Sequence, residues 1–124
     1  MNVDWGNFCH LQTLDLSSSE ISGEIDKFVS SLSKCDNVSL EVLHLWSNNL
    51  GGPIPETLGN IKNLKSLRLQ DNPISGSIPA SIGNLSCLEE LYIADNKLNG
   101  TIPESIGQLK GLIELYLEGN WKVK

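Results

Sequence analysis

Hydrophobic residues return along this chain with a spacing of 24 residues. The stretches 64–87 and 88–111 align position by position, and the same arrangement runs back through 40–63 and forward into 112–124. A repeated unit of this length predicts a solenoid, because each unit can bury its hydrophobic side only against the units before and after it. The matched positions of the three complete units are Leu40, Leu43, Leu45, Asn48, Leu50, Gly52, Ile54, Pro55, Leu58 and Gly59; Leu64, Leu67, Leu69, Asn72, Ile74, Gly76, Ile78, Pro79, Ile82 and Gly83; and Leu88, Leu91, Ile93, Asn96, Leu98, Gly100, Ile102, Pro103, Ile106 and Gly107.

Each regular unit predicts a strand, a turn and a short helical return. In residues 64–69 leucines alternate with polar residues at the period of a strand, so that Ser66 points away from the core. Stacked units place such strands side by side in one parallel sheet, which forms the concave inner face. We expect Asn72 to hydrogen-bond backbone groups of its turn and of the next coil, and Gly76 to allow a positive φ. Residues 81–83 suggest a 3₁₀ turn that closes at glycine on the convex side.

Residues 11–39 form a longer unit, in which the five extra residues follow Ile25. Three hydrophobic residues at helical spacing follow, namely Phe28, Val29 and Leu32. They predict one or two helical turns on the convex side, with Asp26 as the N-cap. Ser19 replaces the asparagine of the later units, so the turn of this coil is expected to be less firmly held.

Both ends of the chain depart from the repeat. Residues 1–10 match only the second half of a unit, with Trp5 in the position of a leucine, and Lys122 stands where the other units have leucine or isoleucine. We therefore interpret the chain as a single domain that is either an excised segment or a truncated gene product. Its fifth coil is expected to stop at its strand. The first residues lack the basic start and apolar run of a secretory signal, and no stretch approaches the ~18 to 20 apolar residues of a membrane span.

The repeated pattern L-x-x-L-x-L-x-x-N-x-L-x-G-x-I-P-x-x-L-G resembles the plant-type extracellular leucine-rich repeat over nearly the whole chain. Residues 32–35 and 119–122 also resemble pieces of receptor-like proteins of plant defence. The resemblance implies an α/β solenoid, a right-handed superhelix or horseshoe segment with a parallel concave β-sheet and convex 3₁₀ or short helical turns. It also implies cell-surface recognition of a protein or peptide ligand, with a co-receptor. Inhibition of a secreted cell-wall hydrolase such as a polygalacturonase is the alternative. An ice-binding function would need regular ranks of Thr or Asn, which the outward residues do not provide.

The outward residues of the predicted sheet form four columns across five strands. The columns are Thr13, Val42, Ser66, Glu90 and Glu114; Asp15, His44, Arg68, Tyr92 and Tyr116; Ser17, Trp46, Gln70, Ala94 and Glu118; and Ser18, Ser47, Asp71, Asp95 and Gly119. Six acids and one arginine stand in these columns, so most of the chain's net charge of −6 falls on one face. A basic partner is therefore expected, and not nucleic acid or anionic lipid.

Aromatic residues share this acidic face, and large rings contribute most to interface energies. The alternative is that the rings only cover neighbouring side chains of a solvated sheet. The residues predicted to contact a partner are Asp15, His44, Trp46, Arg68, Gln70, Asp71, Glu90, Tyr92, Asp95, Glu114, Tyr116 and Glu118.

Asp15 and His44 should be neighbours on adjacent strands, with Ser17 or Ser18 close by, and these are the residue types of a hydrolase triad. An open, wet surface offers neither an oxyanion hole nor exclusion of water. We therefore expect no enzymatic activity. The same pair supplies too few ligands for a metal, and the sequence indicates no cofactor. His10 is expected to be a loop residue.

Cys9 and Cys35 stand shortly before Leu11 and Leu40, so they should lie on the same rim of neighbouring coils, within reach of a disulfide. The alternative is two small buried thiols. Cys87 has no partner and is expected to be buried in its coil.

Three N-x-S/T sequences, beginning at Asn37, Asn84 and Asn99, are consistent with glycosylation of a secreted parent protein. Glycans on them would lie off the sheet face. Uncapped hydrophobic ends also predict self-association between copies.

Overall fold

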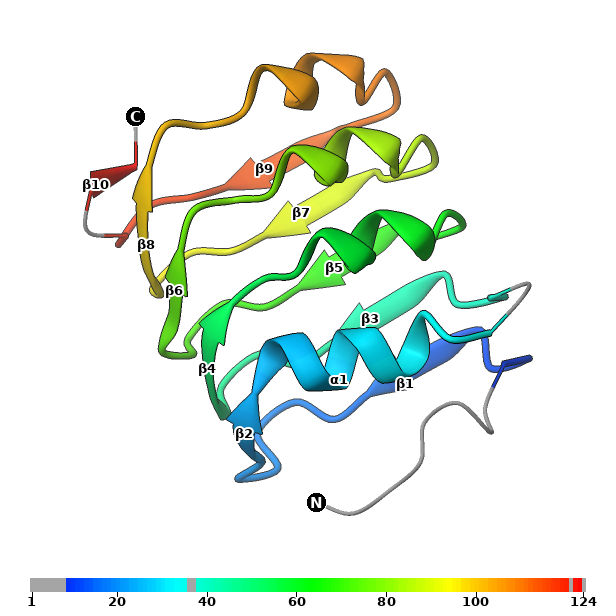
Figure 1. The fold of residues 1–124 in the computed structure, drawn as a ribbon, viewed down its shortest axis with the longest axis horizontal. Helices are drawn as coiled ribbons and strands as arrows, with labels where there is room; N and C mark the ends of the chain where they lie inside the picture. The colour runs from blue at the N-terminus through cyan, green and yellow to red at the C-terminus, as the bar shows by residue number, and fades with distance from the viewer. Residues whose placement is uncertain (1–8, 36–37, 121, 124) are drawn as a thin grey trace.

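The structure is a computed structural model that describes residues 9–35, 38–120 and 122–123 of the chain. The described residues form stacked coils, and each of the first four coils runs through a strand, a second short strand and a helical return (Figure 1). The solenoid predicted from the 24-residue spacing is therefore confirmed. No helix in this part of the chain is long and apolar enough to cross a membrane.

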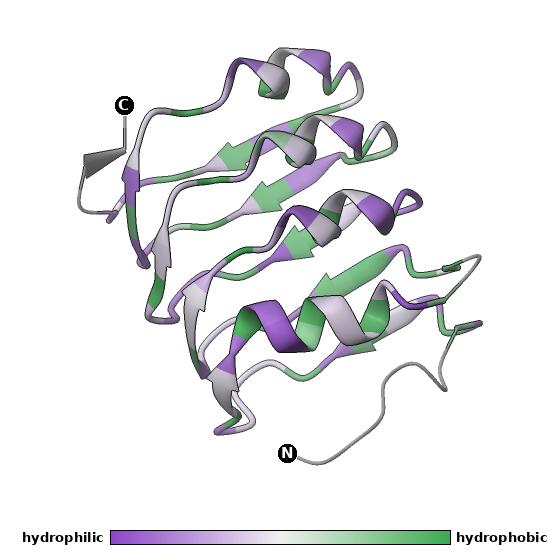
Figure 2. Cartoon of the chain, viewed as in Figure 1, coloured by the Kyte–Doolittle hydropathy of each residue, from purple (hydrophilic) through white to green (hydrophobic). Residues whose placement is uncertain are grey.

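The first sheet lines the concave face and is parallel throughout, in the order β1-β3-β5-β7-β9. Its strands are β1 (Thr13–Asp15), β3 (Val42–His44), β5 (Ser66–Arg68), β7 (Glu90–Tyr92) and β9 (Glu114–Tyr116). The central leucine of a strand points into the core, and Leu43, Leu67 and Leu91 are fully buried. Figure 2 shows hydrophobic residues recurring in the successive strands of this sheet.

A second parallel sheet, which the sequence patterns did not predict, runs along another edge of the coils in the order β10-β8-β6-β4-β2. Its strands are β2 (Ser22–Glu24), β4 (Asn49–Pro53), β6 (Ile74–Gly76), β8 (Lys97–Gly100) and β10 (Lys122–Val123). Lys122 pairs with Asn99 and Val123 with Gly100, so the fifth coil continues past its first strand. The prediction that this coil stops there is wrong, because backbone pairing does not require the missing leucine.

The helical returns are α1 (Ile25–Leu32), η2 (Glu56–Asn60), η3 (Ala80–Asn84) and η4 (Glu104–Gln108). Helix α1 confirms the helical turns predicted for the longer unit, and Phe28, Val29 and Leu32 lie on its buried side. Asp26 is in the first turn and is not the N-cap, which is Glu24 without a side-chain hydrogen bond. The helix starts earlier than predicted because Ile25, also fully buried, belongs to its hydrophobic side.

Gly83 lies inside η3 and does not close it, since the helix ends at Asn84. Its role is close packing between coils. A Cβ added at Gly83 would lie 2.6 Å from the Cβ of Ser105 in the next coil, a distance that real Cβ atoms do not show. The equivalent Gly107 has nothing within 4 Å of the same position.

Buried asparagines tie successive coils together, as predicted, but each one reaches back to the preceding coil and not forward. Asn72 accepts a hydrogen bond from the N–H of Leu50 (3.0 Å) and donates to the carbonyl oxygens of Leu45 (3.0 Å) and Leu69 (3.1 Å). The buried Asn96 and the half-buried Asn48 and Asn120 bond in the same way.

The turn of the Ser19 coil is tied mainly by the asparagine of the following coil. The N–H groups of Ser19 (3.1 Å) and Ile21 (2.9 Å) both donate to Oδ1 of Asn48, which belongs to the following coil. Within its own turn Ser19 donates only to Ser17 O (3.2 Å), whereas Asn48 donates to both Leu45 O (2.9 Å) and Trp46 O (3.3 Å), so the first turn has fewer ties of its own than the later ones.

Cys9 and Cys35 are joined by a disulfide across a sequence separation of 26 residues, with their Cα atoms 5.6 Å apart. The bridge connects the start of the first coil to the loop after α1. Cys87 is exposed, so its predicted burial is wrong. It stands in the turn that precedes β7, and the next residue, Leu88, is the one that enters the core.

On the fifth coil, Ile113 (76%), Leu115 (39%) and Tyr116 (41%) are the large hydrophobic residues that the described structure leaves exposed. The predicted self-association of copies through such surfaces stays a prediction.

Candidate functional site

Outward side chains of the first sheet gather on the concave face because its strands pair in register. The first two predicted columns are confirmed by the strand register: Thr13, Val42, Ser66, Glu90 and Glu114 align, as do Asp15, His44, Arg68, Tyr92 and Tyr116. Beyond the strand ends, backbone hydrogen bonds continue the alignment of the third column. They run from Ser18 N–H to Trp46 O (2.9 Å), Ser47 to Gln70 (3.0 Å), Asp71 to Ala94 (3.1 Å) and Asp95 to Glu118 (2.9 Å).

The fourth predicted column belongs to the turn after the strand and not to the sheet. Its residues adopt left-handed backbone conformations, with φ values of 52° at Ser18, 54° at Ser47, 60° at Asp71, 55° at Asp95 and 79° at Gly119. Glycine and small polar residues are the types that accept such a conformation. The occurrence of only Ser, Asp and Gly at this position was the sequence signal for the turn.

Polar side chains of the first four coils form one connected network. Nδ1 of His44 lies 3.8 Å from Oδ2 of Asp15, and Nε2 of His44 lies 2.9 Å from the Ser66 hydroxyl. Ser66 donates to Oε1 of Glu90 at 2.8 Å. Because that hydroxyl proton is directed at Glu90, Nε2 of His44 must be the donor toward Ser66. Ser66 was predicted to face solvent, yet it is only 9% exposed because the two neighbouring side chains cover it.

The network continues through the last three coils by way of Arg68 and two tyrosines. Arg68 donates to Oε1 of Glu90 (3.0 Å), and its guanidinium carbon lies 4.4 Å from the centre of the Tyr92 ring. The Tyr92 hydroxyl donates to Oε2 of Glu114 (2.7 Å), and its ring meets Tyr116 edge to face, with centroids 4.6 Å apart. The first four residues of the second column therefore each contact a side chain of the following coil.

These contacts set the charge states on the face. Burial lowers the pKa of His44, and the charge of Arg68 lowers it further, so His44 is neutral at pH 7. Hydrogen bonds from Ser66 and Arg68 lower the pKa of Glu90. The hydrogen bond to Glu114 raises the pKa of Tyr92 to about 12.

The order Asp15, His44, Ser66 has the residue types of a hydrolase triad, with Ser66 in place of the predicted Ser17 or Ser18. Its geometry does not provide a nucleophile. The hydroxyl of Ser66 donates to a carboxylate and is nearly buried, and its own N–H, which could help form an oxyanion hole, is bonded to Glu41 O at 3.0 Å. Ser17 instead donates its N–H to Asp15 Oδ1 at 3.0 Å.

The side chains of the third column and of the turn make fewer contacts with one another than the side chains of the first two columns do. Trp46 and Gln70 are partly exposed, Glu118 is exposed, and Ala94 is a small buried residue between them. In the described part of the chain, Oε1 of Gln70 is buried without a hydrogen-bond partner. In the turn, the Ser47 hydroxyl donates to Oδ2 of Asp71 at 2.8 Å.

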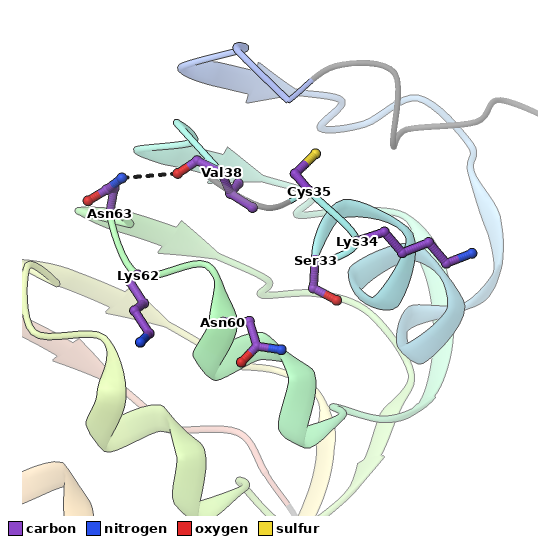
Figure 3. Close-up of a pocket in the computed structure, with 7 residues that line it drawn as sticks. All are labelled: Ser33, Lys34, Cys35, Val38, Asn60, Lys62 and Asn63. Carbon is purple, nitrogen blue, oxygen red and sulfur yellow. Dashed lines mark hydrogen bonds between the residues drawn. The ribbon is translucent and has the colours of Figure 1, made fainter.

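One pocket lies at the turn beside the concave face, and another lies among the loops that follow α1 and η2. A shallow one of about 380 Å³ follows the turn and is lined by Asn48, Asn49, Asp71, Asn72, Pro73, Asp95, Asn96, Lys97 and Gly119. Another, of about 570 Å³, lies near the disulfide and is lined by Ser33, Lys34, Cys35, Val38, Asn60, Lys62 and Asn63. Figure 3 shows its two lysines extending in different directions, so they do not form a convergent anion site. No group of three or more potential metal ligands occurs among the residues described.

One family model, described as leucine rich repeat, matches residues 38–98 and again residues 63–121. A second leucine rich repeat model matches residues 9–25. The chain belongs to the leucine-rich repeat family. It is similar to the LRR receptor-like serine/threonine-protein kinase GSO2 of Arabidopsis thaliana, with 48% identity over 60 residues that cover 48% of this chain and 4% of GSO2. The leucine-rich repeat chain thus spans a small part of the length of that relative.

Solved structures show the same likeness. The LRR ectodomain of the plant membrane receptor kinase GASSHO1/SCHENGEN3 from Arabidopsis thaliana, in complex with CASPARIAN STRIP INTEGRITY FACTOR 2, matches with a TM-score of 0.83 and 38% identity over 93% of this chain and 13% of that chain. The BIR3–SERK2 complex from Arabidopsis thaliana matches with a TM-score of 0.81 and 38% identity over 90% of this chain and 57% of that chain. These relatives confirm the resemblance to plant extracellular leucine-rich repeats.

Proposed function

We propose that this leucine-rich repeat chain is a recognition module of plant cell-surface receptor type that binds a basic protein or peptide on its concave face. The relatives support the partner classes: one receptor-kinase ectodomain was solved with CASPARIAN STRIP INTEGRITY FACTOR 2, and BIR3 was solved with SERK2. A ligand and a co-receptor are therefore the two kinds of partner to test. The defence role implied by the resemblance rests on short sequence pieces, and no contact described above bears on it.

The observation that carries the proposal is the uncompensated charge of the concave face. Arg68 is the one cation of the four columns, and it is already bonded to Glu90. Within the described residues, Asp71, Asp95, Glu114 and Glu118 form no ion pair with a lysine or arginine. A basic partner would compensate these carboxylates, which also speed its encounter with the face.

The position of these carboxylates narrows the contact to one part of the face. All four lie on the last three coils, and three of them belong to the third column or the turn, next to the partly exposed Gln70. Trp46 stands in the same column and supplies the large ring of an interface anchor. We propose that the partner lies along the third column and the turn over the last three coils and reaches Trp46 of the second coil at one end.

The proposal makes the chain a binding scaffold and not an enzyme. The histidine of the concave face is held between Asp15 and Ser66, and the serine is nearly buried, so the network serves to order side chains. An extracellular location of the parent protein is part of the proposal, supported by the disulfide, because such bonds persist in oxidising compartments.

The proposal can be tested with two synthetic peptides of matched length and hydrophobicity, one basic and one acidic. Fluorescence anisotropy measures the affinity of the chain for each peptide. The basic peptide should bind and the acidic one should not. The triple variant Asp71→Asn, Asp95→Asn, Glu118→Gln should weaken binding roughly three- to hundredfold, if each exposed charge pair contributes about 0.2–1 kcal/mol. Added salt should weaken binding of the basic peptide to the unaltered chain, because salt screens the attraction between exposed charges.

Glu104→Gln is the matched control, because it removes an exposed carboxylate from η4, outside the first sheet. It should leave the affinity unchanged. Equal affinity of the triple variant and the control for the basic peptide, or a preference of the chain for the acidic peptide, would rule out the acidic concave face as the binding site. Recovery of partners from plant extracellular fluid, compared between the unaltered chain and a Trp46→Ala, Tyr92→Ala variant, then tests the aromatic contribution.

A further inference from the structure

The concave face already holds one arginine of its own, and that contact shows how the sheet binds a guanidinium group. Arg68 on β5 donates to Oε1 of Glu90 at 3.0 Å, and its guanidinium carbon lies 4.4 Å from the centre of the Tyr92 ring. Glu90 and Tyr92 are the two outward residues of β7, the next strand of the sheet. A carboxylate and a ring on one strand therefore hold an arginine that reaches over from the preceding coil.

The following strand repeats the same three residues without the arginine. Glu114–Tyr116 in β9 has the same sequence as Glu90–Tyr92 in β7, and the two strands pair residue for residue. Tyr92 stands in the preceding coil at the position that corresponds to Arg68. Its hydroxyl donates to Oε2 of Glu114 at 2.7 Å, and this neutral donor leaves the charge of the carboxylate uncompensated.

The ring of Tyr116 lies between two carboxylates and is accessible. Tyr116 meets Tyr92 edge to face and is 41% exposed. Leu117 packs against the core, so Tyr116 and Glu118 on either side of it point outward together. Glu118 is exposed and forms no ion pair within the described residues. The outward side of the fifth coil thus presents a ring with Glu114 before it and Glu118 after it.

The coil before Glu118 sends no side chain over this carboxylate. The N–H of Asp95 donates to the carbonyl oxygen of Glu118 at 2.9 Å, which places Ala94 beside Glu118 in the third column. Ala94 is buried and ends at a methyl group, so it is too short to pair with the carboxylate or to cover the ring. The fifth coil therefore leaves open the kind of position that Arg68 fills on the fourth.

We propose that the fifth coil binds one arginine side chain of the partner, with the guanidinium over the ring of Tyr116 and paired with Glu118. This inference rests on the proposed function, because it names the chemical group by which the basic partner is recognised. Arginine fits the position better than lysine, since a planar guanidinium can stack on a ring and donate two hydrogen bonds to one carboxylate. The ammonium of lysine is a compact, strongly hydrated charge and cannot make both contacts in this way.

Two basic peptides of the same sequence, in which every basic residue is either arginine or lysine, test the inference on the unaltered chain. Fluorescence anisotropy should show the arginine peptide binding at least about two- to fivefold more tightly, which is the advantage of one cation–π contact at an exposed site. Tyr116→Leu should reduce the ratio of the two affinities by that factor. Tyr116→Phe is the matched control and should keep the ratio, because the hydroxyl takes no part in stacking.

The carboxylate provides a second variant that does not depend on replacing the ring. Glu118 is exposed, so Glu118→Gln should keep the urea midpoint of the unaltered chain and weaken binding of the arginine peptide. The same affinity ratio in Tyr116→Leu as in the unaltered chain, or full affinity of Glu118→Gln for the arginine peptide, would overturn this inference alone. If neither peptide binds the unaltered chain, the proposed function fails and the inference fails with it.

Discussion

Replacing Asn72 with alanine is the sharpest test of how the coils hold together. The asparagine is buried and accepts from the Leu50 N–H, donates to the carbonyls of Leu45 and Leu69, and makes a longer bond of 3.3 Å to Gln70 O. Alanine leaves the Leu50 N–H without a partner in the described structure. The two carbonyls keep a second donor each, since Asn48 bonds to Leu45 O at 2.9 Å and Asn96 to Leu69 O at 3.0 Å.

The expected loss of stability has two parts, one from the N–H that loses its partner and one from the carbonyls that keep another donor. A buried N–H left without a partner costs about 1–3 kcal/mol. The two lost hydrogen bonds to carbonyls that keep another donor cost roughly 0.5 kcal/mol each, at the low end of the usual range. Asn72→Ala should therefore lower the free energy of unfolding by about 2–4 kcal/mol. Asn72→Asp should be at least as destabilising, because a carboxylate would face two carbonyl oxygens.

Urea denaturation followed by far-ultraviolet circular dichroism measures this loss as a shift of the midpoint at constant slope. Asn49→Ala is the control, because Asn49 is exposed and makes no side-chain hydrogen bond within the described structure. It should change stability by less than about 0.5 kcal/mol. If Asn72→Ala and Asn49→Ala unfold at the same midpoint, the hydrogen bonds of the buried asparagines do not hold the coils together.

Three further perturbations test the packing, the charge network and the disulfide. Gly83→Ala should destabilise the chain by about 1–3 kcal/mol through overpacking against the next coil, whereas Gly107→Ala should not; equal thermal midpoints would contradict the packing role. The lowered pKa of His44 means that the unfolded chain takes up its proton first, so the free energy of unfolding should decrease as pH falls below the ordinary histidine value of 6.5. His44→Gln should remove that part of the dependence, and a pH profile unchanged by the substitution would refute it. Replacing Cys9 and Cys35 by serine should cost about 2–4 kcal/mol, and an unchanged urea midpoint would show that the bridge does not stabilise the fold.

The repeat spacing predicted the stacked coils and the first sheet, because leucines at fixed positions must be buried in any such solenoid. The second sheet was missed because its pairing is made by backbone atoms, and short strands such as β6 carry only one buried hydrophobic residue. The direction of the asparagine contacts was also missed. Spacing along the chain is the same whether Asn72 bonds forward or backward, so only coordinates could distinguish the two.

The same limit applies to the candidate site, where the columns predicted which side chains share a face but not how they pair. The sequence patterns treated Arg68, Glu90 and Tyr92 as equally available to a partner. In the structure Arg68 contacts both Glu90 and the Tyr92 ring, so its guanidinium and one carboxylate are less available on the surface that we propose for binding. The face therefore remains acidic in net charge, but its available charge is shifted toward the last three coils. A partner whose basic groups are spaced to meet Asp71, Asp95 and Glu118 fits this distribution better than one that spans all five strands.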